Sequence, residues 1–109
     1  MEFALLVYGE ERAWDDMSPT ERQERYEANR AYGRDLAEAG VRVRYGARLA
    51  RPGGATGEDR AAPGELELGG LWLIEVATEE EAREWARRMP VGPGNAVGLR
   101  RCDRPGAAS

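Results

Sequence analysis

Residues 68–90, LGGLWLIEVATEEEAREWARRMP, contain the strongest structural signals in the chain. Two glycines break the chain before Leu71–Val76, and so short a run of bulky apolar residues predicts a strand buried on both faces. Thr78 then predicts a helix N-cap, and Glu81, three residues later, completes a capping box. The helix carries one apolar stripe at the spacing i, i+3, i+4, i+7, made of Ala82, Trp85, Ala86 and Met89. Pro90 ends this helix. The strand and the helix together form half of a small α/β sandwich.

The composition of the chain excludes several classes of function. Its 109 residues make one domain, and a formal charge of −4 argues against nucleic acid as the main partner. The chain has no histidine, which excludes imidazole catalysis and the usual zinc sites, and no lysine, which excludes Schiff-base chemistry. The single cysteine cannot form an intramolecular disulfide, and no stretch has the pattern of a signal peptide or a membrane span. We therefore predict a cytoplasmic protein that uses no metal and no other cofactor.

The first part of the chain predicts a strand followed by a long helix. Phe3–Tyr8 is a second buried strand, and Glu10–Asp16 is a polar connection. The sequence Ser-Pro-Thr-Glu that begins at Ser18 carries the signals of a helix start, and the helix is expected to reach Ala39, before a left-handed stop at Gly40. The positions of this helix expected to be buried are Tyr26, Tyr32, Gly33, Leu36 and Ala37.

Two further strands complete the predicted domain, residues 1–102. Val41–Leu49 alternates apolar and basic residues, which predicts a strand with one wetter face. Its predicted faces are Val41, Val43 and Tyr45 on one side and Arg42 and Arg44 on the other. Asn95–Cys102 is the fourth strand. Residues 51–66, which follow the strand Val41–Leu49, are rich in Gly, Pro and Ala and predict a mobile loop. Residues 103–109 follow the last strand and predict a frayed tail.

The order β-α-β-β-α-β predicts an α+β fold, a ferredoxin-like antiparallel sheet with both helices on one face. The two apolar strands, Phe3–Tyr8 and Leu71–Val76, are then central, and the two arginine-bearing strands form the edges. This arrangement leaves the other face of the sheet without helices, although that face is too hydrophobic to lie in water. We expect a homodimer that packs sheet against sheet.

Three segments of the chain resemble the YCII-related (DGPF) family of small dimeric α/β-barrel proteins. They are the opening FALLVYGEERAW, the helix ending LAEAG, and the LGG segment quoted above. The family's Asp-Gly-Pro-Phe hairpin is replaced here by the shorter PGELELGG. For some members the resemblance implies lyase- or dehydrochlorinase-like chemistry by a His-Asp pair in a pocket between the sheet and the first helix. The corresponding positions here are near Asn29 for the histidine and near Glu10 or Glu11 for the aspartate, so this chain cannot use that pair.

The edge strands and the central strand offer a second group of candidate site residues. Strand alternation places Arg42, Arg44 and Arg100 on the face that also carries Glu75. These arginines could bind a carboxylate or a phenolate, with Glu75 as a base whose pKa is raised by burial. The alternative is structural: edge arginines keep the sheet soluble, and Glu75 forms an ion pair with one of them.

Helix and strand-end residues supply the remaining candidates. Asn29 and Arg30 lie beside the apolar stripe of the first helix, and Tyr8 ends the first strand, where its phenol could hydrogen-bond a ligand. Tyr45 could add an aromatic wall, and Trp14 could cover the mouth of a pocket. The structural alternatives are a solvated helix face for the polar residues and core packing for the aromatic ones.

Two hypotheses about function follow. The first is a cofactor-independent enzyme of the lyase, isomerase or cyclase type that acts by acid/base chemistry on an aromatic or polyketide-like molecule. Its proton shuttle would be Glu75, Tyr8 and Asn29 would position the substrate, and Arg44 would hold an oxyanion. The other substrate-binding candidates are Arg42, Arg100, Arg30 and Tyr45. The second hypothesis is a non-catalytic dimeric module that binds a small ligand or assists a partner protein. Neither hypothesis involves nucleic acid or a membrane.

Overall fold

The structure of the chain is a computed structural model that describes residues 1–49, 66–92 and 94–103. It contains, in chain order, β1 (Glu2–Gly9), α1 (Glu11–Asp15), α2 (Pro19–Glu38), β2 (Arg42–Arg48), β3 (Glu67–Glu75), α3 (Glu79–Arg88) and β4 (Ala96–Arg101). The predicted mobile loop and frayed tail lie outside the described residues, apart from Leu66 and Asp103. No helix in the described ranges is long and apolar enough to span a membrane.

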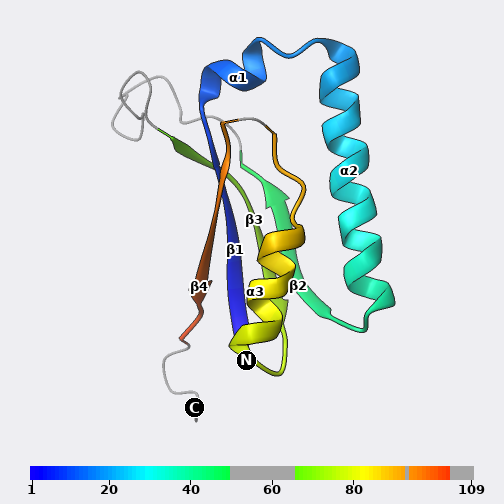
Figure 1. The fold of residues 1–109 in the computed structure, drawn as a ribbon, viewed down its shortest axis with the longest axis vertical. Helices are drawn as coiled ribbons and strands as arrows, with labels where there is room; N and C mark the ends of the chain where they lie inside the picture. The colour runs from blue at the N-terminus through cyan, green and yellow to red at the C-terminus, as the bar shows by residue number, and fades with distance from the viewer. Residues whose placement is uncertain (50–65, 93, 104–109) are drawn as a thin grey trace.

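The strands form a single antiparallel sheet in the order β2-β3-β1-β4. β1 and β3 pair with each other at the centre, and β2 and β4 form the edges. α2 and α3 pack on the same face of the sheet, α2 beside β2 and α3 beside β4, while α1 connects the end of β1 to α2 (Figure 1). We call this covered side the helix face and the other side the open face. The predicted ferredoxin-like α+β arrangement is confirmed, with its central and edge strands as expected.

β3 begins before the two glycines that were expected to break the chain. Gly69 and Gly70 lie inside the strand, and neither has a positive φ. β1 pairs Val7 with Gly70 and Tyr8 with Leu68, so Gly69 is an extra residue that forms a β-bulge. The prediction of a break was wrong because glycine weakens a strand without excluding it.

A second bulge, in β2, reverses the predicted orientation of Tyr45. The register pairs Val43 with Ile74 and Tyr45 with Leu73, which leaves Arg44 as the extra residue. One inserted residue moves every later side chain of a strand to the other face. Tyr45 therefore lies on the open face with Arg44, and not on the same side as Val43 as strict alternation predicted.

The connection after β1, expected only as a polar segment, contains the short helix α1. Its last carbonyl groups are satisfied from α2, because the Arg22 guanidinium donates to the carbonyl oxygens of Trp14, at 3.2 and 3.3 Å, and of Asp15, at 3.2 Å. The same guanidinium lies 5.5 Å from the centroid of the Trp14 ring. A helix of one turn is not stable in isolation, so these contacts with α2 hold Trp14 in position.

Both long helices start where the sequence predicts, with one difference in the caps. At α2, Ser18 Oγ accepts from the Glu21 N–H at 3.1 Å, and Glu21 Oε1 accepts from the Ser18 N–H at 3.2 Å. At α3, Thr78 Oγ1 accepts from the Glu81 N–H at 3.1 Å, but the Glu81 carboxylate accepts from the Ala77 N–H instead, at 3.3 Å. The first capping box is confirmed, and the second is only half formed.

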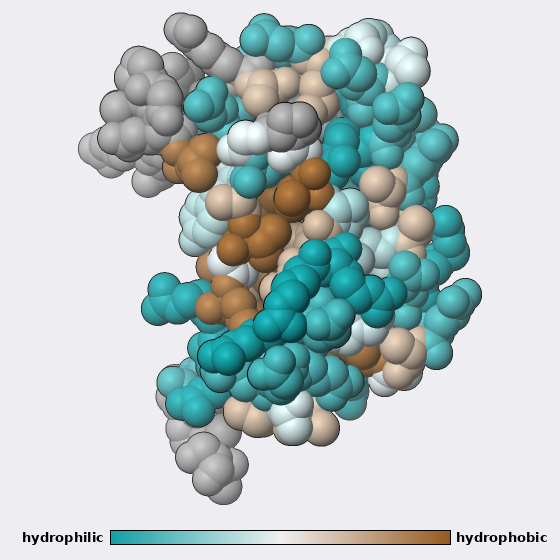
Figure 2. Space-filling view, viewed as in Figure 1, coloured by the Kyte–Doolittle hydropathy of each residue, from teal (hydrophilic) through white to brown (hydrophobic). Residues whose placement is uncertain are grey.

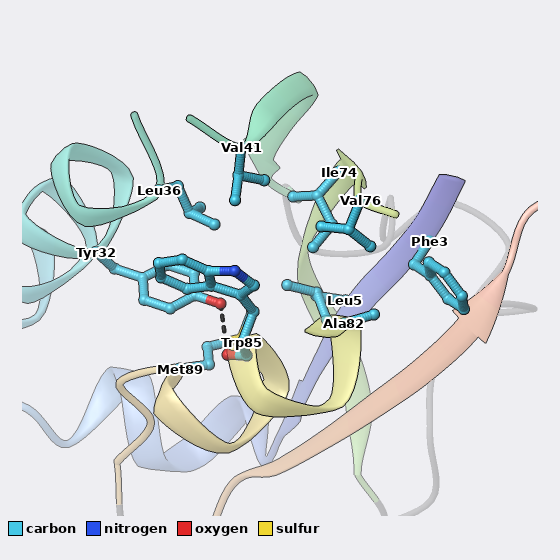
Figure 3. Close-up of a cluster of buried hydrophobic side chains, with 10 residues drawn as sticks. All are labelled: Phe3, Leu5, Tyr32, Leu36, Val41, Ile74, Val76, Ala82, Trp85 and Met89. Carbon is cyan, nitrogen blue, oxygen red and sulfur yellow. Dashed lines mark hydrogen bonds between the residues drawn. The ribbon is translucent and has the colours of Figure 1, made fainter. Parts of the chain in front are cut away.

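The hydrophobic core lies between the helix face and the two long helices (Figure 3). Its buried residues are Phe3, Leu5, Tyr32, Leu36, Val41, Ile74, Val76, Ala82, Trp85 and Met89. The Tyr32 hydroxyl donates to the Trp85 carbonyl oxygen at 2.6 Å, and burial raises the pKa of this phenol above its ordinary value. Tyr26 and Ala37, which were expected to be buried, are exposed: Tyr26 belongs to the part of α2 that extends past the core, and Ala37 faces solvent.

The surface on the helix side separates into hydrophobic and charged regions. A band of hydrophobic residues runs between α3 and β4, bordered by the hydrophilic outer surfaces of the helices (Figure 2). On α3, ion pairs join neighbouring turns, such as Arg83 with Glu79 at 2.9 Å and Arg87 with Glu84 at 3.0 Å. Such exposed pairs are typical of a solvated helix face, so the charges of α3 do not indicate a binding site.

Replacing Ser18 by alanine is expected to lower the free energy of unfolding by about 1 kcal/mol, because it removes one side of the reciprocal cap of α2. Urea denaturation followed by circular dichroism measures the change. Thr20→Ala, an exposed substitution in the same turn, is the matched control and should change the free energy of unfolding by less than about 0.5 kcal/mol. Equal losses in the two variants would contradict a role for the cap.

Candidate functional site

A pocket of about 550 Å³ opens between the helix face of the sheet and the first half of α2. α1 contributes one wall, and the ends of β1, β2 and β3 contribute the floor. The aromatic side chains of the lining are Trp14, Tyr26 and Trp72. Its charged and amide side chains are Glu10, Arg25, Arg30, Arg48, Glu67, Asn29 and Asn95. A pocket of this size with aromatic walls and a few polar groups suits a small organic molecule.

Three glycines on the helix face of the sheet line the pocket. Alternation from the buried residues of each strand places Gly9, Gly46 and Gly70 on the helix face, and all three line the pocket. Glycine inside a strand often marks a place where another group approaches the backbone closely. The missing side chains make room for two lining residues, Asn95 above Gly9 and the Trp72 ring above Gly46.

Trp72 of β3 forms the floor of the pocket, and its ring lies close to two glycines, one in α2 and one in β2. A Cβ at Gly33 of α2 would lie 3.2 Å from the ring, and a Cβ at Gly46 of β2 would lie 3.0 Å from it. Tyr32 packs against the ring edge-to-face, with 5.6 Å between the centroids. A larger residue at either glycine position would displace the ring, so the floor is fixed by the packing around it.

Replacing Gly46 by alanine is expected to lower the free energy of unfolding by about 1–3 kcal/mol, because the added methyl group would lie 3.0 Å from the Trp72 ring and force it to shift. Urea denaturation measures the loss, and tryptophan fluorescence reports the displaced ring. Gly69→Ala is the matched control in β3, where the nearest atom to the added Cβ is 3.9 Å away. If both variants lose the same free energy, the close contact at Gly46 is not what limits the residue size there.

The wall formed by α1 is built around Trp14. The Arg48 guanidinium of β2 lies over the Trp14 ring, with its Cζ 3.5 Å from the centroid. Tyr26 of α2 meets the same ring edge-to-face, with 5.6 Å between the centroids. Nη1 of Arg48 also donates to the Tyr26 hydroxyl oxygen, at 3.4 Å. These contacts join three elements at one corner of the pocket and hold a cation there.

Two carboxylates and two side-chain amides line the pocket near the end of β1. Glu67 is paired with Gly9 in the sheet and Glu10 follows Gly9 in the chain, so both carboxylates come from the same corner. Asn29 reaches the pocket from α2, and Asn95 packs against Gly9, where a Cβ would lie 2.5 Å from its Oδ1. In the part of the chain that the structure describes, no group of three or more Cys, Asp and Glu could hold a metal ion. The carboxylates of the pocket can accept or donate a proton, and the side-chain amides can donate hydrogen bonds to oxygen atoms of a ligand.

The sequence profile of the YCII-related domain matches residues 1–101. The chain belongs to the YCII-related family. No curated protein shows significant similarity to it. In this YCII-related chain, the two positions that the resemblance assigned to an acid/base pair, Asn29 and Glu10, both line the pocket. The side chain of the alternative, Glu11, lies outside the described residues.

The YCII-related sheet separates the site residues expected from the sequence. Asn29 and Arg30 line the pocket. The strand register, and for Arg44 its ion pair with Glu75, place the other expected residues on the open face. They are Tyr8, Arg42, Arg44, Tyr45, Glu75 and Arg100. A single pocket that combines Glu75, Tyr8 and Asn29 is therefore not formed within the chain, because the sheet stands between them.

On the open face, Arg42, Arg44 and Arg100 share the side of Glu75, as predicted. Arg44 lies between two carboxylates, with Nε 3.5 Å from Oε1 of Glu2 and Nη1 3.7 Å from Oε2 of Glu75. The Glu75 side chain is 42% exposed. An exposed carboxylate beside a guanidinium fits the structural alternative for Glu75 better than it fits a buried base.

Three charged groups of the pocket were missed from the sequence: Arg25, Arg48 and Glu67. Strict alternation places Arg48 on the same side as Arg42 and Arg44, whereas the bulge in β2 turns it to the helix face. The signal available in the sequence was the glycines within the strands, because a glycine inside a strand often marks a place where another group approaches the backbone closely.

Proposed function

We propose that the chain is a cytoplasmic, cofactor-independent enzyme of the isomerase, lyase or cyclase type that acts on an aromatic or polyketide-like molecule in the helix-side pocket. One observation carries this proposal: Glu10 and Asn29 line the same pocket of about 550 Å³ as the Trp14 and Trp72 rings. A flat molecule can stack on the Trp72 ring, where the Glu10 carboxylate can act on it as a base.

Proton transfer is the chemistry that these residues support. The Glu10 carboxylate would accept a proton from a carbon of the bound molecule, and the Asn29 side-chain N–H would donate a hydrogen bond to the oxygen on which negative charge develops. Returning the proton at another carbon gives an isomerisation, and departure of a leaving group gives an elimination. Glu10 takes over the role that the sequence suggested for Glu75, because Glu75 lies on the open face.

A non-catalytic ligand-binding module is the second candidate, and one observation favours it. The chain has no histidine, the side chain most often used as a general acid or base near neutral pH. In this reading, the same pocket binds its ligand without changing it, and the protein serves a partner enzyme or a regulator.

Ring opening of 5-nitrobenzisoxazole distinguishes the two candidates. This flat aromatic compound opens to a coloured phenolate when a base removes its one acidic C–H proton, so it reports a carboxylate that acts inside a pocket. The proposal expects saturable ring opening that depends on Glu10. A rate no higher than that of free acetate at the same concentration would support the binding module instead.

The open face supports the proposal of a homodimer. It carries no helix in the described ranges and contains Ala4, Leu6, Tyr8, Tyr45, Leu71 and Leu73. An apolar surface of this kind is normally covered, and packing sheet against sheet would cover it in both copies. The pocket is on the opposite face of the sheet, so each copy of the proposed dimer keeps its own pocket accessible.

A further inference from the structure

We propose that the ligand of this pocket carries a carboxylate and that Arg48 binds it. The inference rests on the proposed function, because it names the class of molecule that the same pocket takes. It adds a binding residue and a chemical requirement that neither the fold nor the acid/base proposal supplies.

Within the described residues, Arg48 is a cation without a counter-charge. Across residues 1–49, 66–92 and 94–103, no carboxylate forms an ion pair with it, and its hydrogen bond there goes to the Tyr26 hydroxyl, at 3.4 Å. A guanidinium carries several N–H donors in a planar fork, so donors remain for a ligand. Two oxygens of one carboxylate match that fork.

Arg48 is also already held in place. Its guanidinium lies over the Trp14 ring, 3.5 Å from the centroid, and reaches Tyr26 on the next element. Arg25 and Arg30 line the same pocket from α2, but within the described residues neither has an ion pair, a hydrogen bond or a ring contact that would fix it. Ordering a free arginine on binding costs conformational entropy, so Arg48 is the better anchor.

The sheet places this anchor beside the aromatic floor. Gly46 is paired with Trp72, and Arg48 follows on the same face of β2, opposite Gly70. Alternate residues of a strand are about 7 Å apart, and Gly70 contributes no side chain to fill the space between. A bicyclic aromatic acid can therefore stack on Trp72 while its carboxylate reaches Arg48.

The charged lining of the pocket suits an anionic ligand. Glu10 and Glu67 line the pocket with Arg48. Arg25 and Arg30 line it as well, so the guanidinium groups of the lining outnumber its carboxylates and favour an anion. A carboxylate carries one charge and matches the guanidinium plane, so we infer a planar monocarboxylic acid.

The first test compares 2-naphthoate, its neutral analogue 2-naphthamide, and 2-naphthyl phosphate by isothermal titration and by the indole N–H signals of the ¹⁵N-labelled full chain. Wild type is expected to bind the naphthoate about tenfold or more tighter than the amide and tighter than the phosphate. The Trp14 and Trp72 signals should shift, and that of Trp85, a core residue outside the pocket, should stay. Equal or better binding of the amide or the phosphate, or no binding of the naphthoate, overturns the inference.

The second test assigns the preference to Arg48. Arg48→Gln is expected to weaken naphthoate binding about 10–100-fold and to remove most of its advantage over the amide, while Arg48→Lys keeps part of the preference. Arg34→Gln, on an exposed part of α2 outside the pocket, is the matched control with the same charge change and should leave both affinities as they are. Loss of both ligands in Arg48→Gln and Arg48→Lys, or loss of the preference in Arg30→Gln instead, overturns the assignment.

The two proposals fail in different experiments. Glu10→Gln should still bind 2-naphthoate at least as well as wild type, because it removes a negative charge near the ligand. If ring opening depends on Glu10 but the acid is not preferred over the amide, the acid/base proposal stands and the carboxylate inference is overturned. If the preference depends on Arg48 but ring opening does not depend on Glu10, the carboxylate inference stands.

Discussion

Glu10→Gln is expected to slow the ring opening of 5-nitrobenzisoxazole by about a hundredfold or more. Glutamine keeps the size of the side chain and its hydrogen bonds, but its amide cannot accept the proton. Glu10 lies beyond the last residue of β1 and is exposed toward the pocket, outside the core. The substitution should therefore leave the melting temperature unchanged, so that a change of rate reports chemistry.

Two carboxylates provide controls for this variant. Glu75→Gln changes a carboxylate on the open face, paired with Arg44, and should leave the rate unchanged. Glu67→Gln changes the second carboxylate of the pocket and should reduce the rate less than Glu10→Gln does. If Glu67→Gln abolishes ring opening and Glu10→Gln does not, Glu67 is the base. If Glu75→Gln abolishes it, the reaction takes place on the open face.

Leu73→Glu is expected to convert a dimer into a monomer, weakening association by about a hundredfold or more. Leu73 lies in the middle of the open face, paired with Ala4 of β1 and Tyr45 of β2. In the proposed dimer, its replacement would bury a carboxylate without a partner, which costs several kcal/mol. Light scattering during size-exclusion chromatography at several concentrations measures the mass.

Ala37→Glu adds the same charge on an exposed position of α2 and is the matched control. It should leave the mass at that of a dimer. The monomeric Leu73→Glu variant should still bind 2-naphthoate, because the sheet separates this face from the pocket. A wild-type chain that is monomeric at about 100 μM, or a Leu73→Glu variant that stays dimeric, would contradict the proposed interface.

Most of the fold follows from local signals in the sequence. The strands Phe3–Tyr8 and Leu71–Val76, the cap at Ser18 and the apolar stripe of α3 each have one dominant physical cause, and the structure contains all of them. The predicted burial of the two strands on both faces is not seen within one chain, because the helices cover one face of the sheet. The errors lie where one residue changes a register. The bulges at Arg44 and Gly69 depend on how two strands pair, which a period of two within one strand does not encode.

The candidate site was harder to predict, because its residues come together only through pairing and packing. Arg30 was found from its place beside the apolar stripe of the first helix, and Asn29 from that place and from the position of the family histidine. Arg48 was not proposed, and strict alternation would have placed it on the face of Arg42 and Arg44, because it does not show the bulge at Arg44. Glu67 lay just outside the predicted strand. Glu75 stood out as one charge in an apolar strand, yet its position on the open face gave it an arginine partner in place of a pocket.

An aromatic relay connects the floor of the pocket to the centre of the core. Trp72 touches Tyr32, and Tyr32 contacts Trp85 both ring to ring, with 5.9 Å between the centroids, and through its hydroxyl. None of the described side chains of α1 belongs to the core, and Trp14 is held by Arg22, Arg48 and Tyr26. Substitutions in the α1 wall can therefore change which ligand binds at little cost in stability. Substitutions of the Trp72 floor also disturb the packing of the core, so they are expected to lower stability.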